Sequence, residues 1–393
     1  VLSGFPWNPA GSAWKAGGAL SQMAAYVGVY GLGFMTVLAF AAAGICRRDR
    51  GFSGYAPAVF GALVIVCGFV VGQTRLMTTP VTNTDYIIRL VQPAIGQAAK
   101  WNRSNFSDLV DAYVSLSTAP PKAGQRVPDL IIWPEGALPV TWENLVDPDS
   151  WTRSVMSGLL QDNQSLIIGT TRQERNADGH LIWRNSLLYL RRQNNETRIE
   201  GAYNKFKLVP FGEFTPYQDI ANRIGISALT HFDDSFTRGE RTKPQSLPGS
   251  PRFLPLICYE GIFPSLDMTS YAPGDPNRPK WIVNISNDAW FGPTTGPVQH
   301  LNLASFRAIE EGLPIVRSTP TGISVVVNPL GRVIKSTRLG LGERGYKDVH
   351  LPNTVTATLY ARERNAVIMF ITLFCLATFL LESAILRRNR QSR

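Results

Sequence analysis

Three side chains that together could form a covalent catalytic site stand at or near the ends of apolar segments. Glu135 follows the apolar run 131–134, Cys258 ends another run at 253–258, and Lys205 lies between them in the chain. A cysteine nucleophile needs a base, because a free thiol has a pKa of about 8.5, and it needs positive charge where an oxyanion develops. A glutamate, a lysine and a cysteine supply these parts without histidine.

Other arrangements of reactive residues find less support in the sequence. The chain contains no G-x-S-x-G, H-E-x-x-H or P-loop string. Its four histidines stand in no catalytic-looking context: His180, His231, His300 and His350. Cys258 is the lone cysteine of the middle of the chain, so a structural disulfide has no second partner there. Taken singly, the three reactive residues also fit ordinary places, as a packed cysteine, a loop glutamate and a solvated lysine, and their types alone leave both interpretations open.

Three stretches that are almost free of charge have about the length needed to cross a bilayer, which is about 20 residues. They cover residues 19–45, 56–73 and 366–386. The loop 47–50 and the tail 387–393 are rich in arginine, so the positive-inside rule predicts both in the cytoplasm and the middle of the chain on the opposite side. In this setting the net charge of +10 favours anionic lipid headgroups over nucleic acid as the partner of the basic surface.

The middle of the chain alternates short apolar strands with helical stretches, a pattern typical of a layered α/β domain. Strands are predicted at 86–92, 129–133, 165–170, 185–190, 253–258 and 281–286. Helices are predicted at 105–117 and 298–311, the second with Pro297 near its start and Gly312 just past its end. A hairpin is expected over 323–334.

These segments predict three regions. We expect a membrane region with two transmembrane helices over 1–81, a catalytic domain over 82–364, and a last transmembrane helix with a basic tail over 365–393. The chain begins at Val1 rather than Met, and its first residues lack the features of a signal peptide. We therefore expect that an upstream part precedes the visible start.

Four strings resemble the nitrilase superfamily of carbon–nitrogen hydrolases: IIWPEGALP, YNKFKLVPFGEFTP, LICYEGIFP and ISNDAWFG. Together with the apolar spans they resemble the apolipoprotein N-acyltransferase family in particular. The resemblance implies an α/β fold, the four-layer α-β-β-α sandwich of nitrilases, with added transmembrane helices. It matches the family's general base to Glu135, its oxyanion-stabilising lysine to Lys205 and its nucleophile to Cys258. Further supporting or substrate-engaging residues are expected at Glu213, Tyr259, Glu260 and Trp101.

The function that the resemblance implies is acyl transfer through a thioester on Cys258. The expected donor is a phospholipid, and the expected acceptor is the α-amine of the N-terminal diacylglyceryl-cysteine of a lipoprotein, at the inner membrane of a bacterium. No cofactor and no metal is expected. Aromatic residues, either lining the access of acyl chains or packing as ordinary core, are Phe211, Phe214, Tyr217, Trp290 and Phe291. Two alternatives stay open: a membrane-tethered amidase or other hydrolase, and a conjugal-transfer relative of the same architecture.

Overall fold

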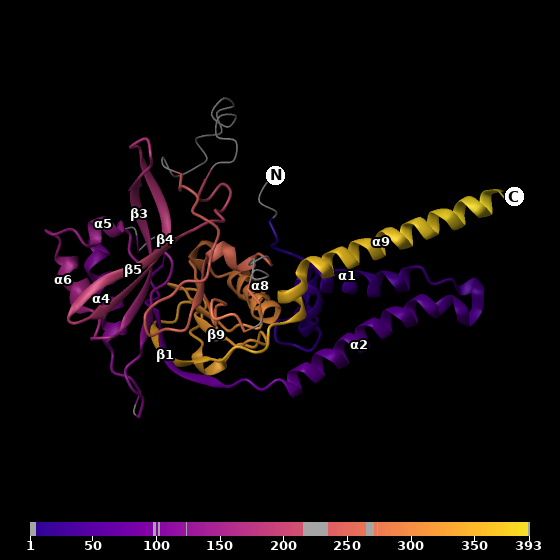
Figure 1. The fold of residues 1–393 in the computed structure, drawn as a ribbon, viewed down its shortest axis with the longest axis horizontal. Coiled ribbons are helices and arrows are strands. Elements are labelled where there is room, and N and C mark those ends of the chain that lie inside the picture. The colour runs from indigo at the N-terminus through magenta and orange to yellow at the C-terminus, as the bar shows by residue number, and fades with distance from the viewer. Residues whose placement is uncertain are drawn as a thin grey trace.

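Two β-sheets packed face to face form the centre of the molecule, and helices cover the outer side of each sheet. The structure is a computed structural model that describes residues 5–96, 100, 103–122, 124–214, 235–264, 271–272 and 274–391. Three long helices project together from one end of this layered domain (Figure 1). The predicted four-layer α-β-β-α fold is confirmed.

The larger sheet has six strands in the order β10-β1-β2-β3-β4-β5. Their bounds are β1 Asn83–Gln92, β2 Leu130–Ile132, β3 Ser165–Arg175, β4 Leu181–Gln193, β5 Glu196–Asn204 and β10 Gly345–Pro352. β1, β2 and β3 run parallel, whereas β3, β4 and β5 form an antiparallel meander. β2 lies between two parallel neighbours, so the residues that follow it emerge at an edge where strand ends meet.

The smaller sheet has four strands in the order β6-β7-β8-β9. Their bounds are β6 Phe253–Ile257, β7 Trp281–Ile285, β8 Ile315–Ser318 and β9 Val325–Val327. The first three run parallel and are buried along their whole length, as continuous apolar runs in parallel sheets usually are.

Three apolar layers hold the sandwich together. The middle layer interleaves side chains of both sheets, among them Leu90, Ile132 and Ile167 from the larger sheet and Phe253 and Val283 from the smaller one. The outer face of the larger sheet is covered by α4 Phe106–Thr118, α5 Trp142–Leu145 and α6 Trp151–Gly158. The outer face of the smaller sheet is covered by α8 Gly296–Glu311, which starts with Pro297 at its amino end and stops at Gly312 in the left-handed conformation.

The projecting helices are α1 Ala24–Gly44, α2 Ala56–Thr78 and α9 Leu359–Gln391. The structure contains two helical segments long and apolar enough to cross a membrane, Leu20–Gly44 and Gly51–Thr78. A third is present if Leu359–Ala366 and Ile368–Leu380, which meet at a bend of 47°, count as one span. α1 packs against α2, α9 and the domain helix α8, so the helices and the domain are joined through α1.

Most predicted elements lie where the sequence placed them, and the differences have simple causes. The predicted hairpin at 323–334 is present with a short returning arm: the N–H of Asn328 donates to the oxygen of Arg332 and the N–H of Ile334 to that of Val326, at 2.9 Å each, on either side of the bridge pair Val327 and Val333. The sequence missed β5, β8 and β10. β5 follows a two-residue turn in which Asn194 and Asn195 both have positive φ, the geometry of tight hairpins, so this Asn-Asn pair was the overlooked signal.

Candidate active site

Cys258 stands at the end of β6, where the chain turns sharply into the short helix η6 Cys258–Ile262. Its φ of +48° lies in the left-handed region, which is strained for a residue with a side chain. The backbone oxygen of Cys258 lies 3.3 Å from Nε2 of His300 and accepts a 3.5 Å hydrogen bond from the Asn284 amide. The turn therefore places the cysteine at a strand end, and His300 and Asn284 hold its backbone carbonyl in position.

Glu135 follows β2 and is buried, with 7% of its surface exposed. Its Oε1 accepts hydrogen bonds of 2.8 Å from the Asn185 amide and 3.1 Å from Nζ of Lys205. Space at this point is tight, because a Cβ on Gly169 of β3 would lie 2.6 Å from the Cα of Glu135. Glycine at 169 thus allows the strand to pass beside the carboxylate.

Lys205 lies directly after β5 and is shared between two carboxylates. Its Nζ donates to Glu213 Oε1 at 2.8 Å as well as to Glu135. Asn185 also donates to both carboxylates, at 2.8 Å each. The second oxygen of Glu213 accepts the backbone N–H of Val209 at 2.8 Å. These contacts hold the ammonium group in one position with little freedom to rotate away.

The electrostatics of this cluster favour charged Glu135 and charged Lys205. Burial alone would raise the pKa of Glu135, but the charge of Lys205 and hydrogen bonds from Asn185, Lys205 and Cys258 hold that pKa below its usual value. Burial alone would lower the pKa of Lys205, but Glu135 and Glu213 raise it above the usual value. The pair is therefore an ion pair in the resting site.

The thiol beside this pair is kept protonated. Burial, reinforced by the charge of Glu135, raises the pKa of Cys258 to about 12. A neutral thiol next to an ionised carboxylate is a nucleophile with a base ready to take its proton, and Lys205 supplies positive charge in the same cluster. The arrangement can thus perform nucleophilic attack on an acyl carbon.

Glu260, two residues after the cysteine, is buried and connects η6 to the segment that carries Lys205. Its Oε1 accepts hydrogen bonds from the Tyr203 hydroxyl at 2.7 Å and from the backbone N–H groups of Phe206 and Lys207 at 2.9 and 3.0 Å. Its Oε2 accepts the N–H of Ile257 at 2.8 Å. Glu260 thus fixes the chain on both sides of Lys205 relative to β6.

The other residues predicted for the site differ in their positions. Tyr259 is buried; its ring stacks on Phe5 with centroids 6.0 Å apart and meets Phe263 edge to face with centroids 4.9 Å apart. Trp290 is 65% exposed and Phe211 is 64% exposed, so neither packs as ordinary core. Trp101 and Tyr217 lie outside the described residues.

Sequence reasoning missed several residues of this region. Asn185, which lies within β4 just before its apolar run 187–190, contacts both carboxylates. Lys100 is buried, donates to the backbone oxygen of Gly136 and has its pKa lowered to about 8 by burial. His300 was set aside on its sequence context, yet its ring lies against the Cys258 carbonyl and 3.0 Å from Asp288. Over the described stretches no group of three or more His, Cys, Asp or Glu residues is arranged to hold a metal ion.

Comparisons with known proteins identify the family. The family model for carbon–nitrogen hydrolases matches residues 87–360. An apolipoprotein N-acyltransferase of Caulobacter vibrioides is 42% identical over 362 residues, covering 92% of this chain and 66% of that protein. The proteins of the same name from Bradyrhizobium diazoefficiens and Sinorhizobium fredii are 40% and 33% identical, covering 92% and 99% of this chain and 66% and 70% of their own lengths.

The chain thus spans about two thirds of the length of the curated relatives it matches. The family model covers the layered domain from β1 into the start of α9, and the relatives extend the match into the apolar helices. On this evidence, the chain belongs to the carbon–nitrogen hydrolase family and, within it, to the apolipoprotein N-acyltransferases.

Proposed function

We propose that this protein transfers a fatty acyl chain from a phospholipid to the α-amine of an N-terminal diacylglyceryl-cysteine. The observation that carries the proposal is the buried cluster of Glu135 and Lys205 beside Cys258, in a domain that is joined to apolar helices. The family membership supports the same reaction, and an amide-forming transferase needs no cofactor for it.

In the first half-reaction Glu135 takes the proton of the Cys258 thiol as Sγ attacks the ester carbonyl carbon of the phospholipid. The negative charge that develops on the carbonyl oxygen is stabilised by Lys205. The carbon–oxygen bond of the ester then breaks, and Glu135 returns the proton to the departing lysophospholipid oxygen. The acyl group is left as a thioester on Cys258.

In the second half-reaction the neutral α-amine of the acceptor attacks the thioester carbon. Glu135 takes a proton from the amine nitrogen as the new carbon–nitrogen bond forms. The carbon–sulfur bond breaks, and the departing sulfur of Cys258 is protonated again by Glu135. The products are an amide on the lipoprotein and a free enzyme in its starting protonation state.

The first test looks for the acyl-enzyme. Incubation with phospholipid alone should give a hydroxylamine-sensitive acyl adduct on Cys258 by mass spectrometry, and Cys258→Ser should lack it. A diacylated lipopeptide with a free α-amine should then discharge the adduct, whereas the same lipopeptide with an acetylated amine should leave it intact. Release of free fatty acid at the same rate without any amine would favour a hydrolase instead.

We also place the membrane region at 1–81, the catalytic domain at 82–364 on the periplasmic side of the inner membrane, and the basic tail in the cytoplasm. The arginine-rich loop 47–50 and tail 387–393 support this orientation. In intact spheroplasts, a membrane-impermeant thiol reagent should label Ser250→Cys and leave Arg50→Cys unlabelled, after subtraction of the wild-type signal. Labelling of Arg50→Cys but not Ser250→Cys would reverse the orientation.

A further inference from the structure

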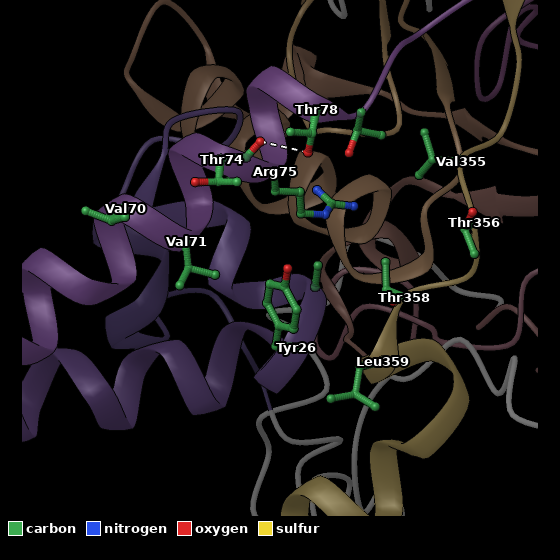
Figure 2. A pocket seen from close by; sticks show the side chains of 12 residues that line it. Tyr26, Val70, Val71, Thr74, Arg75, Thr78, Val355, Thr356, Thr358 and Leu359 are labelled. Atoms are coloured by element: carbon green, nitrogen blue, oxygen red, sulfur yellow. Dashed lines mark hydrogen bonds between the residues drawn. The ribbon is translucent and has the colours of Figure 1, made fainter.

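A cavity separate from the catalytic cluster opens where the projecting helices meet the domain (Figure 2). It has a volume of about 450 Å³, and its wall is formed by α1, by the domain-side end of α2 and by the segment 355–359 that leads into α9. None of the residues that line it belongs to the cluster around Cys258. Its size is that of an ordinary small-ligand site.

Among the described residues that line the cavity, Arg75 is the one cation and no carboxylate is present. Arg75, on the last turn of α2, points into the space between α2, Tyr26 and the segment 355–359 (Figure 2). Its guanidinium donates to the side-chain oxygen of Gln22, and no carboxylate of the described residues forms an ion pair with it. A guanidinium has five N–H donors, and the contact with Gln22 uses one of them.

Gln22 gives this arginine a fixed position. The Gln22 side chain is fully buried, and its amide nitrogen donates to the backbone oxygen of Leu330 in the domain at 2.9 Å. α2 also approaches this point closely, since a Cβ on Gly72 would lie 1.8 Å from the oxygen of Ala19. The cation is therefore held by the contact between the helices and the domain, which is the kind of placement found in a built anion site.

The rest of the wall divides into a polar and an apolar part. Tyr26 and Thr356 both line the cavity and each brings a hydroxyl group to its wall. Val70, Val71 and Leu359 line the other part, and they are 55%, 42% and 40% exposed. Donors around a cation fit a phosphate, and the neighbouring apolar side chains fit the start of acyl chains.

The depth of the cavity in a bilayer fits the same ligand. The charge-free stretch of α2 ends at Gln73, and Arg75 comes two residues later, within the same candidate span Gly51–Thr78. An arginine at such a helix end lies at the level of the lipid headgroups. We propose that this cavity binds the phosphodiester headgroup of a phospholipid through Arg75, as a lipid site apart from the acyl-donor site at Cys258.

The experiment measures retained lipid and needs no turnover, so it is independent of the proposed function. The purified protein in detergent is titrated with phosphatidylglycerol and analysed by native mass spectrometry. Because the proposed acyl-donor site can also take up this lipid, all variants are compared in a Cys258→Ser background that cannot be acylated, and the protein with Arg75 intact should retain one tightly bound lipid more than the protein without it. Arg75→Gln should weaken that binding about tenfold or more, because it removes charge-assisted hydrogen bonds. Arg362→Gln, which removes an equal charge from an exposed position near the start of α9, should bind as wild type.

Two further measurements distinguish a lipid headgroup from free phosphate and control for misfolding of the Arg75 variant. Inorganic phosphate at millimolar concentration should not displace the lipid, because it makes no contact with the apolar wall; full displacement would overturn a lipid site. Val71→Trp, which fills the cavity and leaves Arg75 in place, should also lose the lipid. Equal retention by Arg75→Gln, Val71→Trp and wild type, or an equal loss in Arg362→Gln, would overturn the proposal.

Discussion

Two buried clusters of glutamate and basic residues in this molecule differ in the charge of their carboxyl groups. The active-site cluster comprises Glu135, Asn185, Lys205 and Glu213. The helix-joint cluster, where α8 meets α1, comprises Arg278, Arg307, Glu310 and Glu311. The pKa of Glu135 lies below its usual value, whereas burial raises the pKa of Glu310 and of Glu311 to about 7.

The difference comes from how each carboxylate is partnered. Glu135 accepts hydrogen bonds from a lysine and an amide on one oxygen, which outweigh the effect of burial. At Glu310 burial raises the pKa by more than the ion pair with Arg307 at 2.8 Å and the N–H of Val29 lower it, and the charge of the neighbouring Glu311 adds to the rise. Burial also raises the pKa of Glu260, although Glu260 accepts four hydrogen bonds, so the charge of each carboxyl group depends on the balance between its burial and its partners.

The two clusters also serve different ends of the fold. Gly28 interrupts α1 with φ +69°, and the Tyr360 ring occupies the place where a Cβ would lie, 2.3 Å away. The N–H of Val29, at this break, donates to Glu310 Oε1 at 2.8 Å. The helix-joint cluster thus holds the break in α1 against the domain, whereas the cluster at the candidate active site holds its charges beside the Cys258 thiol.

The largest effect on activity is expected from the substitution of Glu135. Glu135→Gln keeps the shape of the side chain but removes the base, so we expect acyl transfer to fall about a hundred- to ten-thousand-fold in a purified assay. Glu310→Gln makes the same change at the helix joint and should keep activity within about twofold, because its side chain contacts Val29 and Arg307 rather than the cluster around Cys258.

Lys205→Met extends this test to the cation. It should lower the rate of acyl transfer about a hundred- to a thousand-fold. Thermal melting of each variant provides the control for folding. Near-normal turnover in Glu135→Gln or Lys205→Met, or a collapse of activity in well-folded Glu310→Gln, would show that the two clusters have been assigned to the wrong roles.

A smaller effect is expected from the residue that positions Lys205. Glu260→Gln replaces a carboxylate that accepts four hydrogen bonds by an amide that cannot satisfy all of them. The segment around Lys205 should shift, lowering kcat about ten- to a hundred-fold with little change in KM. Tyr203→Phe, which removes one of the four hydrogen bonds to Glu260, should lower kcat by a smaller factor. If kcat fell only in proportion to the unfolded fraction, the role of Glu260 would be general stability.

The comparison also shows what the sequence could and could not predict. Glu135 and Cys258 were predictable because each follows an apolar strand, and strings around them match a family. Asn185 was not, because its contact with two carboxylates depends on the pairing of β4 with β5 and on the course of the chain after β5. His300 was set aside because contact with the Cys258 carbonyl arises only when α8 packs against η6.

The helix joint illustrates the same limit over a longer distance. The sequence predicted the helix that carries Glu310 and the span that carries Val29, with nearly correct bounds. Their hydrogen bond joins residues that are 281 positions apart in the chain. It also requires a break in α1 at Gly28, which the sequence does not distinguish from the other glycines of that span. Local patterns therefore gave the elements, and the contacts between elements had to come from the structure.

The smallest expected effect concerns the pH dependence of stability at the helix joint. The pKa of Glu310 and of Glu311 is raised to about 7 in the folded protein, above the value of about 4.3 for an unfolded glutamate. The folded state therefore holds extra protons between these values. The resulting stabilisation is fully present below about pH 4.3 and is lost as the pH rises through about 7. We expect the wild-type free energy of unfolding to fall by about 2–3 kcal/mol for each of the two groups from pH 5 to pH 8. Glu310→Gln and Glu311→Gln should each flatten the decline in apparent melting temperature over this range, whereas Glu240→Gln on the exposed surface should leave it unchanged. Parallel melting profiles for all four proteins would mean that both carboxyl groups are ionised in the folded state, and that the helix-joint cluster carries the same charge state as the active-site cluster.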